Sequence, residues 1–265
     1  MNATLDVGFL DLLLALVLIL ASGLISFLLR LELEKRLALG AARTVVQLLL
    51  VGWLLKFIFN LQSPLAVLAL LGLMVIVASR VALGRPSRRV RGAGWLAFLS
   101  LAASATLTTF SVTSLVIGVE PWYEPRYLIP LMGMVLGNSM NGISLSLDAL
   151  LERLSERADQ VELELSLGAS AWEAARRPLR EALRRGMIPI LNTMMVVGIV
   201  SLPGMMTGQI LAGADPMLAV KYQILIMFMI AAATSLGAML MSLLTARRLF
   251  SRDHRLLREK ILRGA

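Results

Sequence analysis

Long runs of apolar residues dominate this chain, and short polar segments separate them. A helix needs roughly 20 apolar residues to cross a bilayer core of about 30 Å, and seven runs have that length. They lie near residues 7–29, 41–59, 64–83, 93–117, 127–147, 189–211 and 221–245. No long Ser-, Gly- or Pro-rich linker divides them. The pattern therefore predicts an all-α integral membrane protein with about seven transmembrane helices, in which residues 1–265 form a single transmembrane domain.

Lysine and arginine residues gather at alternate ends of these runs. If the N-terminus lies outside, every one of the 26 basic residues except Lys56, Arg126 and Lys221 falls in a cytoplasmic segment. Cytoplasmic loops of membrane proteins are enriched in Lys and Arg, so we predict an external N-terminus and a cytoplasmic C-terminus. Six or eight helices would break this alternation. We accordingly expect a multi-pass protein of the inner (cytoplasmic) membrane.

Composition and charge narrow the class of protein further. Hydrophobic residues make up 58% of the chain and charged residues only 16%, which is too little polar surface for a soluble domain. The net charge of +9 follows the ends of the apolar runs, so it indicates orientation in the lipid bilayer and not a nucleic-acid partner. The chain has no cysteine and one histidine, His254 in the charged tail. Thiolate, zinc and Ser-His chemistry therefore have almost no basis.

Residues 148–188 form one long polar segment with helical periodicity between the fifth and sixth runs. Its first part has an apolar face made of Leu147, Leu150, Leu151, Leu154 and Ala158. Gly168 breaks the pattern, and Ser170 followed by Glu173 is the capping-box signature of a new helix. We expect this second helix to be interrupted at Pro178. The segment is either an amphipathic connector on the membrane surface or a docking element for a cytoplasmic partner.

The spacing inside this segment resembles the first half of the EAA loop of ABC-importer permeases. In that loop a glutamate precedes a glycine by six residues, as Glu162 precedes Gly168 here. The second half departs from the motif at Pro178, Arg180 and Glu181. The EAA loop forms the coupling helix that seats in a groove of the ATPase subunit. The resemblance implies an ATPase-coupling role for Glu162, Glu164, Gly168, Ser170 and Glu173.

Four stretches spread over nearly the whole chain together resemble the FetB-type permeases of ABC transporters. They are residues 43–48 (RTVVQL), 137–142 (GNSMNG), 189–194 (PILNTM) and 201–213 (SLPGMMTGQILAG), of which the last is the most specific. The resemblance implies a permease that works with a separate ATP-binding subunit. Bacterial members of this family are associated with iron export, and plant relatives with aluminium tolerance.

The sequence itself fits this division of labour. It contains no Gly-x-x-x-x-Gly-Lys-Ser/Thr phosphate-binding loop, so we expect ATP and Mg²⁺ on a partner ATPase, and no enzymatic activity or cofactor on this chain. Seven helices are few to enclose a pathway, which favours a homodimer with a two-fold axis. The alternative is a secondary carrier or channel that needs no ATPase, but no internal repeat is evident. An intramembrane protease is disfavoured, because the predicted spans offer no histidine and only one carboxylate, Asp11.

Polar side chains within the predicted spans are candidates for a translocation path, because polar groups at membrane depth usually face the interior of the bundle. They are Arg43, Gln47, Asn138, Asn141, Asn192 and Gln209. The alternative role is interhelical hydrogen bonding, at about 0.6–2 kcal/mol per contact. Pro203 and Gly204 predict a kink or hinge in the sixth run. Asp11, Met205 and Met206 are candidate metal contacts, although thioethers prefer soft cations and methionine is also an adaptable packing residue.

Overall fold

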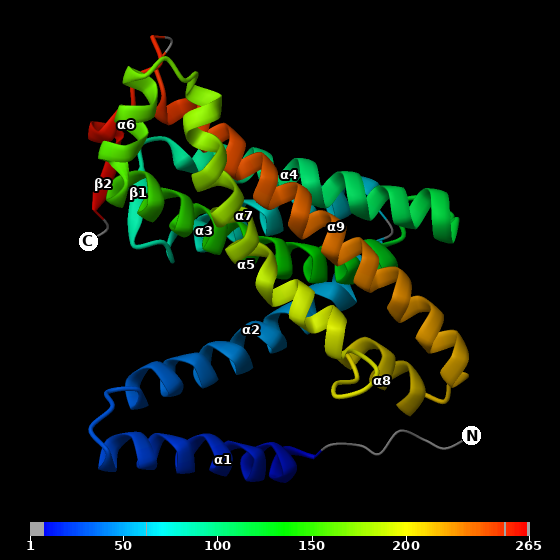
Figure 1. Cartoon of the computed structure of the whole chain (residues 1–265). Coiled ribbons are helices and arrows are strands. Elements are labelled where there is room, and N and C mark those ends of the chain that lie inside the picture. Colours follow the sequence, from blue (N-terminus) through cyan, green and yellow to red (C-terminus); the bar gives the residue numbers. More distant parts are fainter. Residues whose placement is uncertain (1–7, 62, 252, 264–265) are drawn as a thin grey trace. The chain divides into compact units, whose positions relative to one another are not determined.

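The computed structural model describes residues 8–61, 63–251 and 253–263, whose helices and strands are shown in Figure 1. The chain divides into two compact units, which we describe separately. Unit 1 comprises Met1–Ser63 and Leu211–Ala214, and unit 2 comprises Pro64–Ile210 and Asp215–Ala265. Most of the described residues are helical, which confirms the predicted all-α class.

The described part of unit 1 is built from two helices joined by a short turn. They are α1 (Phe9–Leu28) and α2 (Glu34–Leu61). α1 begins where the Gly8 N–H donates a 2.8 Å hydrogen bond to Asp11 Oδ2. Ser26 holds the turn, because its hydroxyl donates to Glu34 Oε2. α2 begins well before the predicted run at residue 41, since most of residues 34–40 are strong helix formers and extend it.

Unit 2 contains the remaining elements, apart from the last residue of α8. These elements are α3 (Pro64–Leu83), β1 (Arg88–Val90), α4 (Ala93–Phe110), the π-helix η1 (Ser111–Ile117), α5 (Pro125–Glu156), α6 (Ala158–Ser166), α7 (Ala171–Val196), α8 (Gly204–Leu211), α9 (Pro216–Leu249), the 3-10 helix η2 (Arg258–Lys260) and β2 (Ile261–Arg263). Proline opens α3, α5 and α9, where its missing N–H would have had no partner. Asp215 caps α9 by accepting a 2.9 Å bond from the Leu218 N–H.

α5 is the central helix of unit 2 and packs against α3, α4, α7 and α9 (Figure 1). Glycine sets the closest approach between these helices. A Cβ at Gly186 of α7 would lie 2.7 Å from the carbonyl oxygen of Gly142 in α5. A Cβ at Gly142 would lie 2.5 Å from Thr234 Cγ2 of α9. Three helices therefore meet at a point where only glycine fits, and close packing of small residues is a usual mode of helix association in lipid.

Six helices in the described part of the chain are long and apolar enough to cross a membrane. They are Leu10–Leu28, Glu34–Leu61, Pro64–Leu83, Ala93–Ile117, Pro125–Glu156 and Pro216–Leu249. The predicted single run at 189–211 is wrong, because its residues are divided between the end of α7 and α8. The helix ends at Val196, since Gly198 has a φ of +86° and the surrounding valines and isoleucine are β-branched. The number of crossings and the side of each terminus stay predictions.

The segment 148–188 differs from its prediction in two respects. α5 continues without a break from the fifth run to Glu156, and the predicted first helix of the segment is divided at Arg157 between α5 and α6. The predicted interruption at Pro178 is wrong, because α7 passes through it to Val196. Pro178 is buried beside Ala174 and Ala175. The burial of Pro178 offsets the loss of the backbone hydrogen bond that proline cannot donate. The predicted break at Gly168 is confirmed, since it falls between α6 and α7.

Candidate functional site

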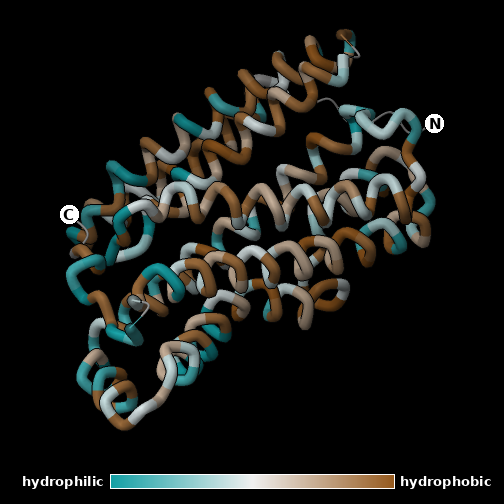
Figure 2. The backbone as a smooth tube through the Cα atoms, turned by 90° about the horizontal axis from the view of Figure 1, so that it is seen from above, coloured by the Kyte–Doolittle hydropathy of each residue, from teal (hydrophilic) through white to brown (hydrophobic). Residues whose placement is uncertain are grey.

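Hydrophilic residues gather at the end of unit 2 that carries the C-terminus (Figure 2). This basic end consists of the last turns of α5, α6, the first half of α7, the α3–α4 linker with β1, and the tail that follows α9. Figure 1 shows α6, β1 and β2 close together there. Within the predicted docking segment 148–188, we call α6 and the first half of α7, residues 158–184, the coupling segment.

The apolar face predicted for the end of α5 is confirmed. Its members are all buried to at least 98%, namely Leu147, Leu150, Leu151, Leu154 and Ala158. Because these side chains pack inside unit 2, this part of the chain is anchored to the protein core. A connector that only rested on lipid would leave that face uncovered. The coupling segment therefore starts from a fixed base.

The turn between α6 and α7 is defined by a glycine and a capping box. Gly168 has a φ of +96°, a conformation that favours glycine. The Ser170 hydroxyl accepts from the Glu173 N–H at 3.3 Å, and Glu173 Oε2 accepts from the Ser170 N–H at 2.8 Å. The Ser170 hydroxyl also donates to Glu173 Oε2, and these two bonds lower the pKa of Glu173, the hydroxyl having the larger effect. The predicted capping box is confirmed.

Ion pairs fasten α7 to the end of α5. Glu181 of α7 lies 3.0 Å from the Arg153 guanidinium and 3.7 Å from that of Arg157. Arg185 of α7 in turn lies 2.6 Å from Glu152. Each exposed ion pair contributes little alone, but a connected set of partly buried pairs fixes orientation. These pairs hold α7 and the end of α5 in a fixed relative orientation.

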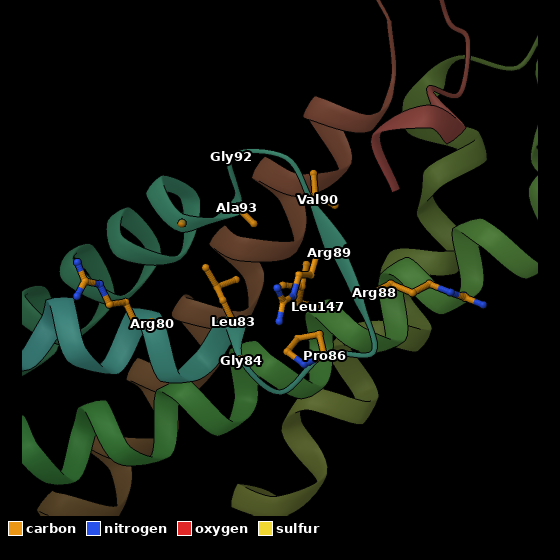
Figure 3. A pocket seen from close by; sticks show the side chains of 11 residues that line it. Arg80, Leu83, Gly84, Pro86, Arg88, Arg89, Val90, Gly92, Ala93 and Leu147 are labelled. Atoms are coloured by element: carbon orange, nitrogen blue, oxygen red, sulfur yellow. The ribbon is translucent and has the colours of Figure 1, made fainter. Parts of the chain in front are cut away.

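The α3–α4 linker is tied to the same part of α5. The Ser87 N–H and hydroxyl both donate to Asp148 Oδ1 at 2.8 Å. The Arg88 guanidinium donates to the Leu151 and Glu152 carbonyl oxygens at 3.3 and 3.0 Å. Arg88 is also one of the residues that line a cavity of about 370 Å³, together with Arg80, Arg89 and Leu147 (Figure 3). The linker is thus hydrogen-bonded to α5 at several points.

The corner between α6 and α7 carries apolar side chains that face solvent. Leu163, Leu167 and Trp172 are 60%, 79% and 60% exposed, and glutamates flank Leu163 on both sides and Trp172 on one. An open groove of about 1040 Å³ runs from this corner along α7. Its lining changes from charged to apolar along the helix and includes Glu164, Arg176, Arg180, Arg184, Ile188 and Leu191. Exposed large apolar residues within a polar rim are typical of a protein interface.

The structure does not join the predicted path residues into one polar cluster. Among the described residues, no hydrogen bond links any two of Arg43, Gln47, Asn138, Asn141, Asn192 and Gln209. The Asn141 side-chain oxygen accepts from the Arg85 guanidinium, which places it toward the basic end. Asn138 donates to the Met134 carbonyl oxygen at 2.9 Å within its own helix. Asn192 is exposed on α7, and Arg43 and Gln47 are exposed in unit 1.

The predicted hinge and metal contacts occupy different settings. Pro203 immediately precedes α8 and Gly204 begins it, so the break in the chain lies just before these residues and not in the middle of a helix. Asp11 caps α1 through Gly8. Met205 and Met206 are half-buried in the first turn of α8. Within residues 8–61, 63–251 and 253–263, no group of three or more acidic or histidine side chains is placed to hold a metal ion.

Two residues of the tail, Arg258 and His254, make contacts that the sequence analysis does not predict. Arg258 in the tail reaches both Asp159 and Glu162 of α6. His254 Nδ1 accepts a 3.0 Å bond from the Ala171 N–H at the start of α7. Sequence reasoning treated the tail only as a charged cytoplasmic end, since tail and coupling segment are far apart in the chain. The sequence signal for these contacts is limited to the mixture of basic and apolar residues over 256–263.

The long apolar helices and the asymmetric basic end define a multi-pass helical membrane protein. Residues 9–250 match the uncharacterised protein family UPF0014. The chain belongs to this family of membrane proteins. The suspected family resemblance is thereby confirmed.

Three relatives align with this chain over most of their own length. The UPF0014 membrane protein slr1647 of Synechocystis sp. is 41% identical over 86% of this chain and 88% of its own. The probable iron export permease protein FetB of Escherichia coli is 33% identical over 92% of each chain. The protein ALUMINUM SENSITIVE 3 of Arabidopsis thaliana is 32% identical over 91% of this chain and 87% of its own. No solved structure matches.

Proposed function

We propose that this chain is the membrane-spanning permease subunit of an ATP-driven (ABC) transporter. In this proposal a separate ATPase binds ATP and Mg²⁺ and docks on the coupling segment from the cytoplasm. Alternating access would follow, because ATP-driven closure of two ATPases pushes the coupling segments of two permease copies. The exported cargo would be a metal ion such as iron.

The proposal rests mainly on one observation. Three apolar side chains at the α6–α7 corner are exposed, namely Leu163, Leu167 and Trp172. Interface hot spots are enriched in tryptophan and lie within a rim that excludes water. Here Glu162, Glu164 and Arg176 supply such a rim. The base of the segment is held by buried leucines and by the Glu181 ion pairs. A rigid element with an apolar tip suits the transmission of force to α5 and α7.

The course of α5 and α7 supports this mechanism. Both helices run from the coupling segment into the bundle and cross at Gly142 and Gly186. Such tight crossings transmit displacement, because packed interiors have little free volume to absorb it. We therefore expect a push at Trp172 to tilt α7 against α5 and α9.

The cargo is proposed from relatedness alone. The Escherichia coli relative is named a probable iron export permease, at 33% identity over 92% of each chain. The plant relative is named for aluminium sensitivity, which agrees with a metal cargo in this proposal. In the proposal iron is a transported substrate and not a resident cofactor of this chain.

A homodimer is part of the proposal. Ile188, Leu191 and Met195 are exposed on the later half of α7. This apolar stripe continues past the coupling segment to the end of the helix. A second copy packed on it would enclose a path between two protomers, in accord with the two-fold symmetry that most oligomers adopt.

The decisive experiment measures binding of a cognate ABC ATPase, one without its own membrane domain, to the permease in lipid nanodiscs. Trp172→Ala is expected to weaken binding by about tenfold or more, because hot-spot truncations cost about 2 kcal/mol or more. Trp95→Ala is the matched control. Trp95 is 64% exposed in the first turn of α4, outside the coupling segment, and its replacement should leave binding unchanged.

Equal ATPase binding by wild type and Trp172→Ala would overturn the docking assignment. The competing class of function is tested in proteoliposomes loaded with ferrous or ferric iron. We expect transport only when the ATPase and ATP are present. Transport by the permease alone would identify a secondary carrier or channel. Quenching of Trp172 fluorescence by brominated lipid would instead support an amphipathic connector that lies on the membrane.

A further inference from the structure

The tail after α9 folds back across the basic end as an ordered strap. An antiparallel bridge between Phe250 and Leu256 closes its first turn, and both side chains are largely buried. The Leu257 N–H then donates to the Leu249 carbonyl oxygen at 2.8 Å. In Figure 1 the strap, in red, lies against α6 and β1. We define the strap as the described residues 250–251 and 253–263.

The strap makes specific contacts with both helices of the coupling segment. The Arg258 guanidinium donates to Asp159 Oδ1 at 2.6 Å through one nitrogen and to Glu162 Oε1 at 2.7 Å through another. Two carboxylates one turn apart on α6 thus share one planar group, which is a geometry that lysine cannot reproduce. His254 accepts from the Ala171 N–H, one of the backbone donors that a helix start leaves free.

The far end of the strap is joined to a different part of unit 2. β2 pairs antiparallel with β1, and Val90, which is buried, faces Ile261 in the register. β1 lies in the linker between α3 and α4. The strap itself continues directly from α9. It therefore connects α6 and α7 on one side with α3, α4 and α9 on the other.

We infer that the strap is a mechanical link that positions the coupling segment and carries its displacement to the α3–α4 linker, with Arg258 as the main positioning residue. The inference rests on the proposed docking of an ATPase on the coupling segment. It adds a second transmission route to the direct one through α5 and α7. Without the strap, α6 would be held only through its chain connections and its packing beside α5 and α7.

The contacts of neighbouring basic residues support the positioning role of Arg258. Arg255 is exposed in the same strap, and no side-chain contact is seen for it among the described residues. Lys260 donates to the Arg248 carbonyl oxygen at 3.2 Å, which is within the α9–strap junction. Of these three cations, only Arg258 reaches α6. Arg255→Ala is therefore a matched control that removes the same charge from the same segment.

The absence of native cysteine makes a direct test possible. A spin label on Ser166→Cys reports the mobility of α6 in the permease alone, in nanodiscs. Arg258→Ala is expected to raise the mobile fraction about two- to tenfold, a modest range because exposed ion pairs are individually weak. Arg255→Ala should leave the spectrum unchanged. Arg258→Lys should give an intermediate value, since it retains the charge but not the two-pronged geometry.

Transmission is measured with a second label, on Arg91→Cys in the α3–α4 linker. Binding of the ATPase with ATP should change the spectrum of this label when Arg258 is present. In Arg258→Ala the spectral change should be at least twofold smaller. An unchanged α6 spectrum in Arg258→Ala would overturn the positioning role, whatever the ATPase does. If the label at position 91 responds to ATPase binding as strongly in Arg258→Ala as in the chain with Arg258, the proposed transmission through the strap is overturned. Failure of the ATPase to bind the unmodified permease would instead count against the proposed function.

Discussion

At the start of α7, two side chains satisfy backbone groups that a helix end leaves free. Ser170 and Glu173 exchange bonds in the reciprocal pattern that their spacing predicts. Such local motifs are readable because all partners lie within a few residues. Arg258 is the contrasting case, since its partners Asp159 and Glu162 are about a hundred residues away in sequence. Nothing in the local pattern indicates that pairing.

The capping box gives a pH prediction. The pKa of Glu173 is lowered in the folded state, first by the Ser170 hydroxyl and then by its N–H. Its contribution to stability is therefore complete above the ordinary carboxyl pKa of about 4.3 and is lost as the pH falls through the lowered folded value. We expect Glu173→Gln to speed amide exchange in the first turn of α7 at pH 7. The difference from wild type should shrink as the pH falls below the ordinary carboxyl pKa and disappear once Glu173 is protonated in the folded state.

Hydrogen-exchange mass spectrometry of peptides covering Ala171–Ala174 checks this expectation. Glu156→Gln is the control, because Glu156 is exposed at the end of α5 and no partner is seen for it among the described residues. It should alter exchange at neither pH. Equal protection of wild type and Glu173→Gln at pH 7 would show that the capping bonds do not hold the helix start.

At the scale of helices, the tightest constraint is the crossing of α5 and α7. In the sequence, Gly142 belongs to the stretch 137–142 that resembles the permease family, but no pattern indicates a role for Gly186. The structure places Gly186 against the Gly142 carbonyl oxygen. The pair Gly142 and Ser146, with three residues between them, is a small-xxx-small pattern that could have suggested a close crossing. The partner helix could not have been named from it.

The crossing predicts a steric effect of a single methyl group. Gly186→Ala would place Cβ 2.7 Å from a backbone oxygen, so the helices must separate. We expect a loss of about 1–3 kcal/mol in stability, as for other overpacked sites. The measurement is thermal unfolding of the purified protein in one fixed detergent.

Gly137→Ala supplies the comparison for that experiment. A Cβ at Gly137 has nothing within 4 Å, so the change should be neutral or stabilising through the better helix propensity of alanine. Equal unfolding temperatures for Gly186→Ala and Gly137→Ala would show that α5 and α7 do not approach this closely.

At the scale of the whole molecule, orientation in the bilayer decides which end faces an ATPase. Almost all basic residues of unit 2 lie at or near the basic end, and the loop between η1 and α5 lies at the other ends of α4 and α5. The positive-inside rule assigns the basic end to the cytoplasm. Two single-cysteine variants test this assignment, namely Ser166→Cys in α6 and Glu120→Cys in the opposite loop.

We expect a membrane-impermeant maleimide to label Glu120→Cys in intact cells and Ser166→Cys only after permeabilisation. The chain has no cysteine of its own, so background labelling is absent. Labelling of both positions from the same side would contradict the topology. Labelling of Ser166→Cys in intact cells would place the coupling segment outside and remove the basis for ATPase docking.

The sequence by itself determined the all-α membrane class, the apolar face that ends α5, the break at Gly168 and the capping box that follows. Each depends on hydrophobic periodicity or on partners within a few residues, which a linear pattern records. The division of 189–211 into two helices follows Gly198 and its β-branched neighbours, a local signal that lies within the apolar run. Tertiary structure decided that α7 continues through Pro178 and that Gly142 meets Gly186. It also decided that the strap reaches α6. These outcomes depend on packing between segments distant in sequence, where buried contacts override local propensity and no local pattern specifies the partner.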